Sequence, residues 1–316
     1  MITLLPFLLF SQVTYHQEAP IRLDLAYFEF EKVTVTKKNI LVIADKEEVV
    51  HVFGLDGSYQ TKLGEDSQVI QLPQNTSWLD EKEQVLVYDA AKRFFSLWDD
   101  SGGLIEEKKT DFDMFFEVGK MLPLQDGYVA PVSLTKDGHL LAHFNPEFAI
   151  TSFAYELMSP KLSEMSTVVR QSFASQAIIN GRSIVLAAQS LSPKLHFFDA
   201  DLKPTGSMVL EAKRWRKANL KRLEKVSKNP KELRKLQASF SEVVGLETIS
   251  GSMFLVGFRN LKGSDYSYQC YEARARIQIG PSFDGPYKLV GAYGKRIYLI
   301  DPNAATMTLT PCLVQR

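Results

Sequence analysis

A pair of short β-prone segments recurs along the chain, and this repeat restricts the folds that the chain can adopt. Residues 39–53 contain the first pair and residues 84–98 the second, and each pair is followed by a turn that contains Asp and Gly. Asp45 and Asp89 end the first segment of each pair and are 44 residues apart. A period of about 40–50 residues with four strands per unit is typical of the blades of a β-propeller.

Weaker copies of the pair follow, and they set the number of units. They occupy residues 127–138, 182–199, 252–258 and 295–301. Together with the two clear pairs they predict six units in 316 residues, once residues 211–240 are set aside. A single blade has two faces to cover, and packing blades around an axis buries both of them. We therefore expect an all-β chain, a six-bladed β-propeller with a short helical-hairpin insertion.

The last unit has too few strands for a complete blade, so the ring needs a strand from elsewhere. Three clear strands precede Arg316. The β-prone run Ile21–Leu25 could supply the fourth strand, and residues 29–36 would then begin the first blade. Pairing of the two ends of the chain would close the ring. We therefore expect deletion of residues 14–26 to lower stability sharply.

Residues 211–240 differ from the rest of the chain. They contain eleven Lys or Arg and three Glu, a net charge of +8, whereas the whole chain is neutral. Apolar residues at helical spacing predict a helix over residues 211–227. Asn229 then fits an N-cap, Pro230 the first helical position and Glu232 a capping box. This segment therefore predicts a basic helical hairpin between the outer strand of unit four and the inner strand of unit five.

Four residues of this hairpin are candidate binding residues. Trp215 supplies an apolar surface, and the cations Lys217, Lys221 and Arg222 follow it. A basic surface of this kind attracts a small anionic ligand, an acidic protein partner or a membrane surface. The alternative is a solvated helical lid that packs on the rim of the propeller through Trp215 and the leucines. A nucleic-acid partner is not expected, because no aromatic stacking platform accompanies the basic residues.

A second candidate site is the aromatic run between units two and three. Phe112, Phe115 and Phe116 belong to the sequence DFDMFF at residues 111–116. The connection from one unit to the next places this run on the same face as the basic hairpin. The three side chains could line a pocket or an interface. The alternative is that they belong to the core between two blades.

The first ten residues are almost entirely apolar. This run is shorter than the roughly 20 apolar residues that a transmembrane helix requires, and no later segment predicts one. It is similar to the apolar region of a signal peptide. We therefore interpret residues 1–13 as a signal peptide and residues 14–316 as the propeller, exported to the periplasm or the extracellular space. The alternative is a buried N-terminal strand. In an oxidising compartment Cys270 and Cys312 could form one disulfide or remain two half-buried thiols.

The two clear units resemble the repeats of bacterial six-bladed β-propellers of the NHL/TolB-like superfamily. The resemblance is carried by residues 40–57 and 85–102, and it extends to a charged helical insert before a blade, as at residues 211–240. It implies that the insert lies on the face that commonly carries ligand sites. Many of these propellers are exported, so the resemblance implies a fold and an export route more than an activity.

Candidate catalytic groups are scarce in the sequence. The five histidines show no metal-ligand spacing, and no nucleophile motif is present. Asp45, Asp89 and Asp301 occupy equivalent positions in units one, two and six. Residues that recur from unit to unit usually serve the repeat, so we interpret these three as turn formers. In propeller hydrolases, carboxylates near the axis hold calcium, so the resemblance implies such a calcium site if this protein is a hydrolase.

We therefore expect a non-enzymatic binding or protein-interaction module, which is a monomer, has no cofactor and binds no nucleic acid. No residue is assigned a catalytic role. The alternative is a hydrolase or lyase that uses Ca²⁺ or another divalent metal at a carboxylate site in the central channel.

Overall fold

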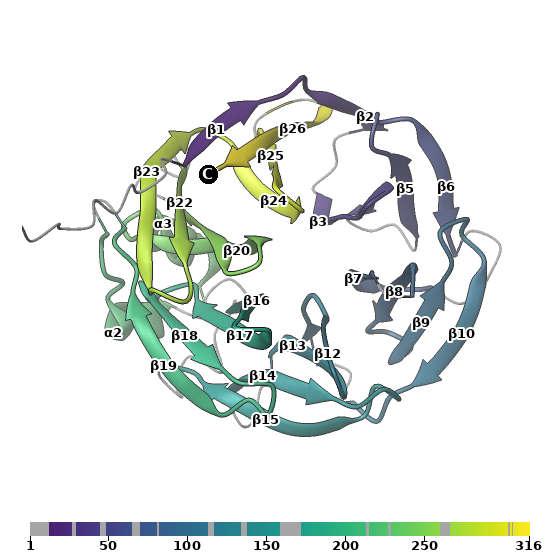
Figure 1. Ribbon diagram of the computed structural model, residues 1–316, viewed down its shortest axis with the longest axis horizontal. Helices are drawn as coiled ribbons and strands as arrows, with labels where there is room; N and C mark the ends of the chain where they lie inside the picture. The colour runs from purple at the N-terminus through teal and green to yellow at the C-terminus, as the bar shows by residue number, and fades with distance from the viewer. Residues whose placement is uncertain are drawn as a thin grey trace, which may run out of the picture.

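The computed structural model describes residues 13–26, 30–44, 49–64, 70–80, 82–112, 117–133, 138–158, 172–212, 215–226, 229–259, 266–302, 304 and 306–316. These residues form six antiparallel sheets arranged in a ring, with two short helices beside them (Figure 1). Each sheet is one blade of a β-propeller, and its strands follow one another from the axis to the rim. The predicted all-β, six-bladed fold is confirmed.

Four blades are built from four consecutive strands. Blade one contains β3 (Phe30–Val35), β4 (Asn39–Ala44), β5 (Val50–Gly54) and β6 (Tyr59–Leu63). Blade two contains β7 (Pro73–Leu79), β8 (Gln84–Asp89), β9 (Phe94–Trp98) and β10 (Leu104–Lys109). Blade four contains β16 (Ser172–Ile179), β17 (Arg182–Gln189), β18 (Lys194–Phe198) and β19 (Pro204–Val209). Blade five contains β20 (Glu242–Ser250), β21 (Met253–Arg259), β22 (Tyr266–Glu272) and β23 (Ile277–Gly285).

The other two blades are divided differently. In blade three the inner strand is interrupted, and its two parts, β11 (Glu117–Val118) and β12 (Leu122–Leu124), both pair with the second strand, β13 (Gly127–Ser133). The third and fourth strands of this blade are β14 (His139–Phe144) and β15 (Ile150–Glu156). Blade six takes three strands from the end of the chain, β24 (Lys288–Tyr293), β25 (Arg296–Ile300) and β26 (Thr306–Gln315).

Strands β1 (Thr14–Gln17) and β2 (Ile21–Ala26) complete blade six. Both pair with β26, so that Thr14 lies opposite Gln315 and Ile21 lies opposite Leu309. Between them the backbone N–H of Glu18 donates to the carbonyl of Pro311 at 2.9 Å. The two segments therefore act as one outer strand. The expected closing strand at residues 21–25 is confirmed, and β1 extends it.

The middle strands of a blade are covered on both faces by the neighbouring blades. All five residues of β5 are buried. By contrast, β10 lies at the rim, and five of its six residues are exposed. This difference explains why the β-prone runs are clearest in the sequence at the middle strands, where burial demands continuous apolar residues.

Buried apolar side chains between neighbouring blades form the core. Among the described residues, six clusters each join two adjacent blades. Between blades one and two, for example, Ile43 and Val52 share a cluster with Trp78 and Val87. Burial of one such side chain stabilises the fold by roughly 1.5–3 kcal/mol, so blade-to-blade packing holds the ring together.

Val13 precedes β1 and is buried in the cluster between blades five and six. Gly280 of β23 lies next to it with φ +72°, and a Cβ at Gly280 would come within 2.8 Å of the Val13 Cβ. Only glycine fits this approach. Packing of the described propeller therefore begins at Val13, whereas residues 1–12, which include the apolar run, lie outside the described part of the chain.

One turn geometry joins the third and fourth strands of blades one to four. In each case the N–H of the fourth turn residue donates to the carbonyl of the first, and the fourth residue has a positive φ. That residue is Gly57 in blade one and Gly102 in blade two, but Phe148 in blade three and Leu202 in blade four. The backbone repeat is thus more regular than the sequence repeat.

The insert between β19 and β20 contains helices α2 (Leu220–Val226) and α3 (Pro230–Gln237). The first helix is shorter than the predicted 211–227, because Asn219 caps it: the Asn219 Oδ1 accepts the Arg222 N–H at 3.1 Å. The predicted cap of the second helix is confirmed, since the Asn229 Oδ1 accepts the Glu232 N–H at 3.2 Å. The insert is therefore a short helical pair preceded by an irregular segment.

Candidate functional site: the central channel and the basic insert

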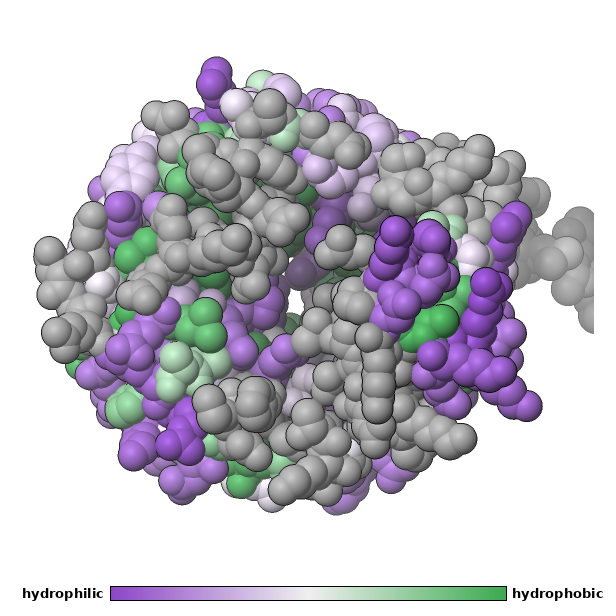
Figure 2. Space-filling model, turned by 180° about the vertical axis from the view of Figure 1, so that it is seen from behind, coloured by the Kyte–Doolittle hydropathy of each residue, from purple (hydrophilic) through white to green (hydrophobic). Residues whose placement is uncertain are grey.

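A cavity of about 710 Å³ occupies the axis of the ring. Its walls come from the inner strands of all six blades, β3, β7, β11, β16, β20 and β24. The cavity reaches the face at which these strands begin, which is also the face that receives the insert. Figure 2 shows this face, with the hollow at the centre of the ring. Every blade therefore contributes to the wall that a ligand in the cavity would meet.

The described walls of the cavity carry several charged side chains. Four are cations, Lys32, Lys120, Arg259 and Lys288, and three are carboxylates, Glu117, Glu242 and Glu247. These groups have a net charge of +1 when all are ionised. Lys32, Glu117, Glu242 and Lys288 stand in the first half of their inner strands, near the mouth. The channel is therefore a polar site with a small excess of positive charge.

Glu242 and Arg259 form the most buried ion pair of the channel. They lie opposite each other on β20 and β21, and the Arg259 Nη2 is 2.7 Å from the Glu242 Oε2. The other carboxylate oxygen, Oε1, is buried without a donor among the described residues. Burial raises the pKa of Glu242 to about 7, although the positive charge of Arg259 acts in the opposite direction. Near neutral pH, Glu242 is therefore divided between its neutral and ionised forms.

Lys288 begins β24, the inner strand that follows blade five around the ring. Its side chain lines the cavity and is partly buried. Burial lowers the pKa of Lys288, and the nearby positive charge of Arg259 lowers it further. No carboxylate in the described chain forms an ion pair with it. Among the described residues, Lys288 is thus a channel cation without a carboxylate partner.

A second ion pair crosses the channel deeper inside. The Lys120 Nζ, between β11 and β12, lies 3.1 Å from the Glu247 Oε2 on β20. The pair therefore joins blade three to blade five and passes in front of blade four. Glu247 stands five residues beyond Glu242 along the same strand, which places it about 15 Å further from the mouth.

The insert contacts the channel through Arg259. The Arg259 Nη2 donates to the carbonyl of Gln237 at 3.4 Å, and Gln237 is the last residue of α3. Carbonyl groups at a helix C-terminus carry partial negative charge, which suits a guanidinium partner. The helical pair is therefore attached to the same arginine that pairs with Glu242.

The apolar sides of the two helices face the propeller. Leu223, Leu233 and Leu236 are buried in one cluster with Leu140 of blade three and Leu191 of blade four. The hydrophilic group at the right of Figure 2 lies over these helices. The insert thus packs as the lid alternative expected, with its charged side turned to solvent.

The structure separates the four predicted insert residues into two environments. Trp215 is half-buried and packs edge-on against Phe258, with ring centroids 6.2 Å apart. Lys217, Lys221 and Arg222 are exposed, and none of them forms an ion pair with a described residue. Trp215 therefore anchors the irregular segment, and only the three cations contribute to a surface.

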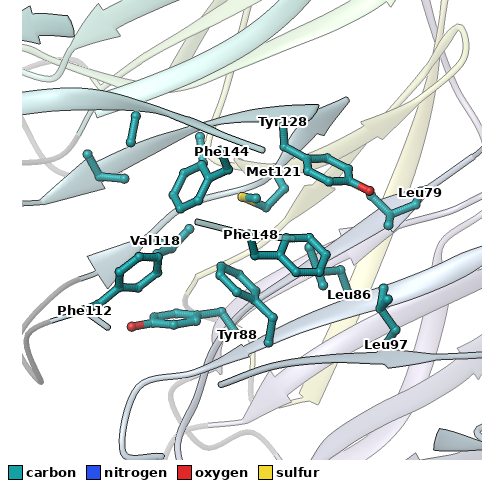
Figure 3. Close-up of a cluster of buried hydrophobic side chains, with 14 of the residues drawn as sticks. Leu79, Leu86, Tyr88, Leu97, Phe112, Val118, Met121, Tyr128, Phe144 and Phe148 are labelled. Atoms are coloured by element: carbon teal, nitrogen blue, oxygen red, sulfur yellow. The ribbon is translucent and has the colours of Figure 1, made fainter. Parts of the chain in front are cut away.

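Phe112 lies in the core between blades two and three. It is buried, and its ring centroid lies 5.8 Å from that of Phe144 and 6.1 Å from that of Tyr88 (Figure 3). It is not among the residues that line the channel cavity. This placement agrees with the core alternative for Phe112. Phe115 and Phe116 lie outside the described residues.

The predicted Asp positions form turns where they are described. Asp89 is buried, and its carboxylate accepts the backbone N–H groups of Leu72 at 2.8 Å and Lys92 at 2.9 Å. The carbonyl of Asp301 accepts the Ala304 N–H at 3.3 Å, and Asp45 lies outside the described part. Across the described ranges, no three His, Cys, Asp or Glu residues are grouped as a metal ion would require.

Sequence reasoning missed the charged groups of the channel. Three of these groups, Glu117, Glu242 and Lys288, are the first residues of inner strands. A charged residue at the start of a β-prone run was therefore the sequence feature that could have identified them. That signal identifies a position near the axis only after the strand order of each blade is known.

The fold is shared with proteins of very low sequence identity. A member of the DUF4221 family from Bacteroides vulgatus matches 97% of this chain and 99% of its own, with a TM-score of 0.67 and 9% identity. A candidate exported protein from Bacteroides fragilis matches 96% of both chains, with a TM-score of 0.63 and 11% identity. Raptor from Chaetomium thermophilum matches 89% of this chain and 22% of its own, with a TM-score of 0.53 and 11% identity.

No model of a known protein family matches the sequence, and no curated protein matches it. The structural matches therefore establish the class, a six-bladed β-propeller, and nothing about activity. Within the described residues, no helix has the length and apolar character needed to cross a membrane.

Proposed function

We propose that the protein is an exported, non-enzymatic binding module that holds a small ligand in its central channel. The observation that carries this proposal is the cavity of about 710 Å³, which lies within the usual range of about 300–1,000 Å³ for small-molecule sites. Polar and charged groups from several blades converge on it. A few polar groups that converge on one cavity fix the orientation of a bound ligand, which favours a ligand site over a channel that holds water alone.

We also propose that the protein is exported. Export is supported by the apolar run at residues 1–10 and by the likeness to a candidate exported protein. The relationship to NHL/TolB-like propellers belongs to the proposal as well, and it is supported by the repeats at residues 40–57 and 85–102. Whether the destination is the periplasm or the extracellular space is tested by cell fractionation.

Two of the three carboxylates in the described channel wall are held in ion pairs, which favours binding over metal-dependent hydrolysis. Glu242 is paired with Arg259 and Glu247 with Lys120. A carboxylate held by a cation is a poor ligand for Ca²⁺ until that pair is broken, and Ca²⁺ takes six to eight oxygen ligands. We expect millimolar Ca²⁺ to leave the melting temperature unchanged. A clear rise would favour the hydrolase alternative, because a ligand of the folded state stabilises it.

The ligand is sought by native mass spectrometry of the protein purified from its source. Ser133→Trp places a large ring at the channel wall, because Ser133 lines the cavity and is partly buried. Thr205→Trp is the matched control, since Thr205 is exposed on the rim strand β19. We expect a co-purifying small molecule to be lost from the first variant and kept by the second. Equal retention by both variants, with circular dichroism showing that both fold, would contradict the proposal.

A second candidate function is docking of an acidic protein through the insert. It is favoured by the exposed cations Lys217, Lys221 and Arg222, which have no ion pair with described residues. A monomeric propeller could use this surface without contacts to another copy. The test replaces all three cations by Gln and compares partner capture with that of Lys295→Gln, which lies on the opposite face. Capture that survives the triple replacement would exclude this role.

A further inference from the structure

We propose that the corner of the channel formed by Lys288, Arg259 and Glu242 selects a small organic anion, a carboxylate or a phosphate monoester, with Lys288 as its ion-pair partner. This inference rests on the proposed function, because it names the class of ligand that the channel holds. The corner lies where β24 of blade six packs against β20 of blade five, whose neighbouring strand β21 carries Arg259.

Lys288 is the cation that a bound anion would neutralise. Its ammonium group is partly removed from water in the channel wall and has no carboxylate partner in the described chain. Two effects disfavour its charged form, burial and the adjacent positive charge of Arg259. The negative charge of a bound anion would offset both effects, and the attraction between opposite charges is larger in a partly desolvated site than at the surface.

Arg259 is the second cation at this corner. Its Nη2 makes both of its observed contacts, one to Glu242 and one to the carbonyl of Gln237. The Nε and Nη1 groups have no partner among the described residues. A guanidinium has five N–H donors in one plane, and a carboxylate or phosphate can accept two of them at once. Arg259 can therefore hold Glu242 and still donate to a ligand.

Glu242 would repel a bound anion when it is ionised, and its surroundings weaken that repulsion. Glu242, Arg259 and Tyr266 stand opposite one another on the adjacent strands β20, β21 and β22. Lys288 faces the same corner from β24, and Gln237 approaches from α3. Because burial raises the pKa of Glu242 to about 7, its negative charge is partly removed near neutral pH.

The rest of the described channel wall does not reverse this balance. The remaining charged groups that line it are Lys32, Lys120, Glu117 and Glu247. Lys120 and Glu247 neutralise each other, which leaves Lys32 and Glu117. Once Glu242 is protonated, the charge of the whole set rises from +1 to +2. The local excess of positive charge at Lys288 and Arg259 therefore decides which ligands are favoured.

The test uses three probes that share one sugar ring and differ in charge: glucose, glucuronate and glucose 6-phosphate. Binding to the full chain is measured by titration calorimetry. We expect glucuronate or glucose 6-phosphate to bind at millimolar concentration or below and glucose to bind at least about tenfold more weakly, as loss of one charge-assisted contact implies. The two anions show whether the site prefers a carboxylate or a phosphate.

Two variants of opposite effect separate a binding role from a structural one. Lys288→Met should weaken anion binding by about tenfold or more, and Lys288→Arg should restore most of it. Glu242→Gln should strengthen anion binding, because it removes the opposing charge at constant size. Lys295→Met is the control, since Lys295 is exposed in the β24–β25 turn at the other end of the same hairpin.

The outcomes distinguish this inference from the proposed function. Equal affinity for glucose and the two anions would overturn the inference and leave the channel as a ligand site. Unchanged anion binding in Lys288→Met would also overturn it. If none of the three probes binds at millimolar concentration, the inference fails, while a small molecule lost from Ser133→Trp would still support the channel as a site.

Discussion

Lys120 and Glu247 form an ion pair across the channel, 3.1 Å apart and 127 positions apart in the sequence. Blade four lies between blades three and five along the ring, so the ion pair spans part of the channel and does not join neighbouring blades. It also occupies the channel beyond the mouth. Any ligand that enters from the face of the insert would meet this pair at the inner end of the cavity.

The pair should couple blades three and five weakly but measurably. The side chains of Lys120 and Glu247 are 40% and 18% exposed, so solvent screens part of their attraction. A double-mutant cycle with Lys120→Met and Glu247→Gln should give a coupling of roughly 0.5–1 kcal/mol, which falls in high salt. The pair of Lys203 and Asp201, exposed at 74% and 66%, is the control and should show none. Equal coupling in both pairs would contradict this expectation.

Glu242 should make the propeller less stable as pH rises through neutrality. Its pKa in the fold is about 7, against an ordinary value of 4.5. Between these values the folded protein holds a proton that the unfolded chain has released, so stability falls as pH increases across the interval. Relative to the native chain, Glu242→Gln should gain stability from pH 5 to pH 8, by on the order of 3 kcal/mol at most. Urea denaturation measures the difference, and a value that does not change with pH would show that Glu242 remains ionised.

Closure of the ring should depend on Leu23. This residue of β2 is buried in the cluster between blades six and one. Leu23→Ala should cost roughly 2–5 kcal/mol, because the cavity it leaves is enclosed. Arg22→Ala is the neighbouring control, since Arg22 is exposed, and should stay within about 0.5 kcal/mol of the native chain. Thermal unfolding of the two variants makes the comparison, and a small loss in Leu23→Ala would mean that β2 contributes little.

Cys270 and Cys312 should be free and unreactive in the folded protein. Both are buried, and burial raises the pKa of each thiol to about 11. The Tyr15 hydroxyl also donates to the Cys270 Sγ at 3.3 Å. At pH 8 roughly one thiol in a thousand is then thiolate, which is the form that reacts. A thiol reagent should label neither in native buffer and both in denaturant without reductant. Labelling of neither in denaturant would reveal a disulfide.

The fold was predictable because burial leaves a direct mark on the middle strands. β8 matches the predicted run at residues 84–89, and it is buried at five of its six residues. Blades three and four were harder to recognise, because Phe148 and Leu202 hold the turn position that glycine holds in blades one and two. A non-glycine residue can take a positive φ when the surrounding fold fixes it, and a single sequence cannot show this.

The candidate site was less predictable, because it depends on contacts between distant parts of the chain. The basic insert is visible in the sequence as a run of charge. The corner of Glu242, Arg259 and Lys288 is not, since its members come from two blades and meet only when the ring is closed. Two roles were predicted for Trp215, a binding residue beside the cations or an anchor on the propeller, and it packs on Phe258. Its aromatic ring finds an apolar neighbour across the blade surface, which helical spacing alone does not reveal.

The pairing of β1 and β2 with β26 has a consequence for synthesis. Among the described strands of the propeller, those at residues 14–26 are made before the others, and their partner at residues 306–315 is made after them. Until then β1 and β2 lack the strand with which they pair in the folded protein. A chain that terminates before residue 306 would present open strand edges to chaperones and proteases. Pairing with β26 therefore determines whether these edges are covered or open.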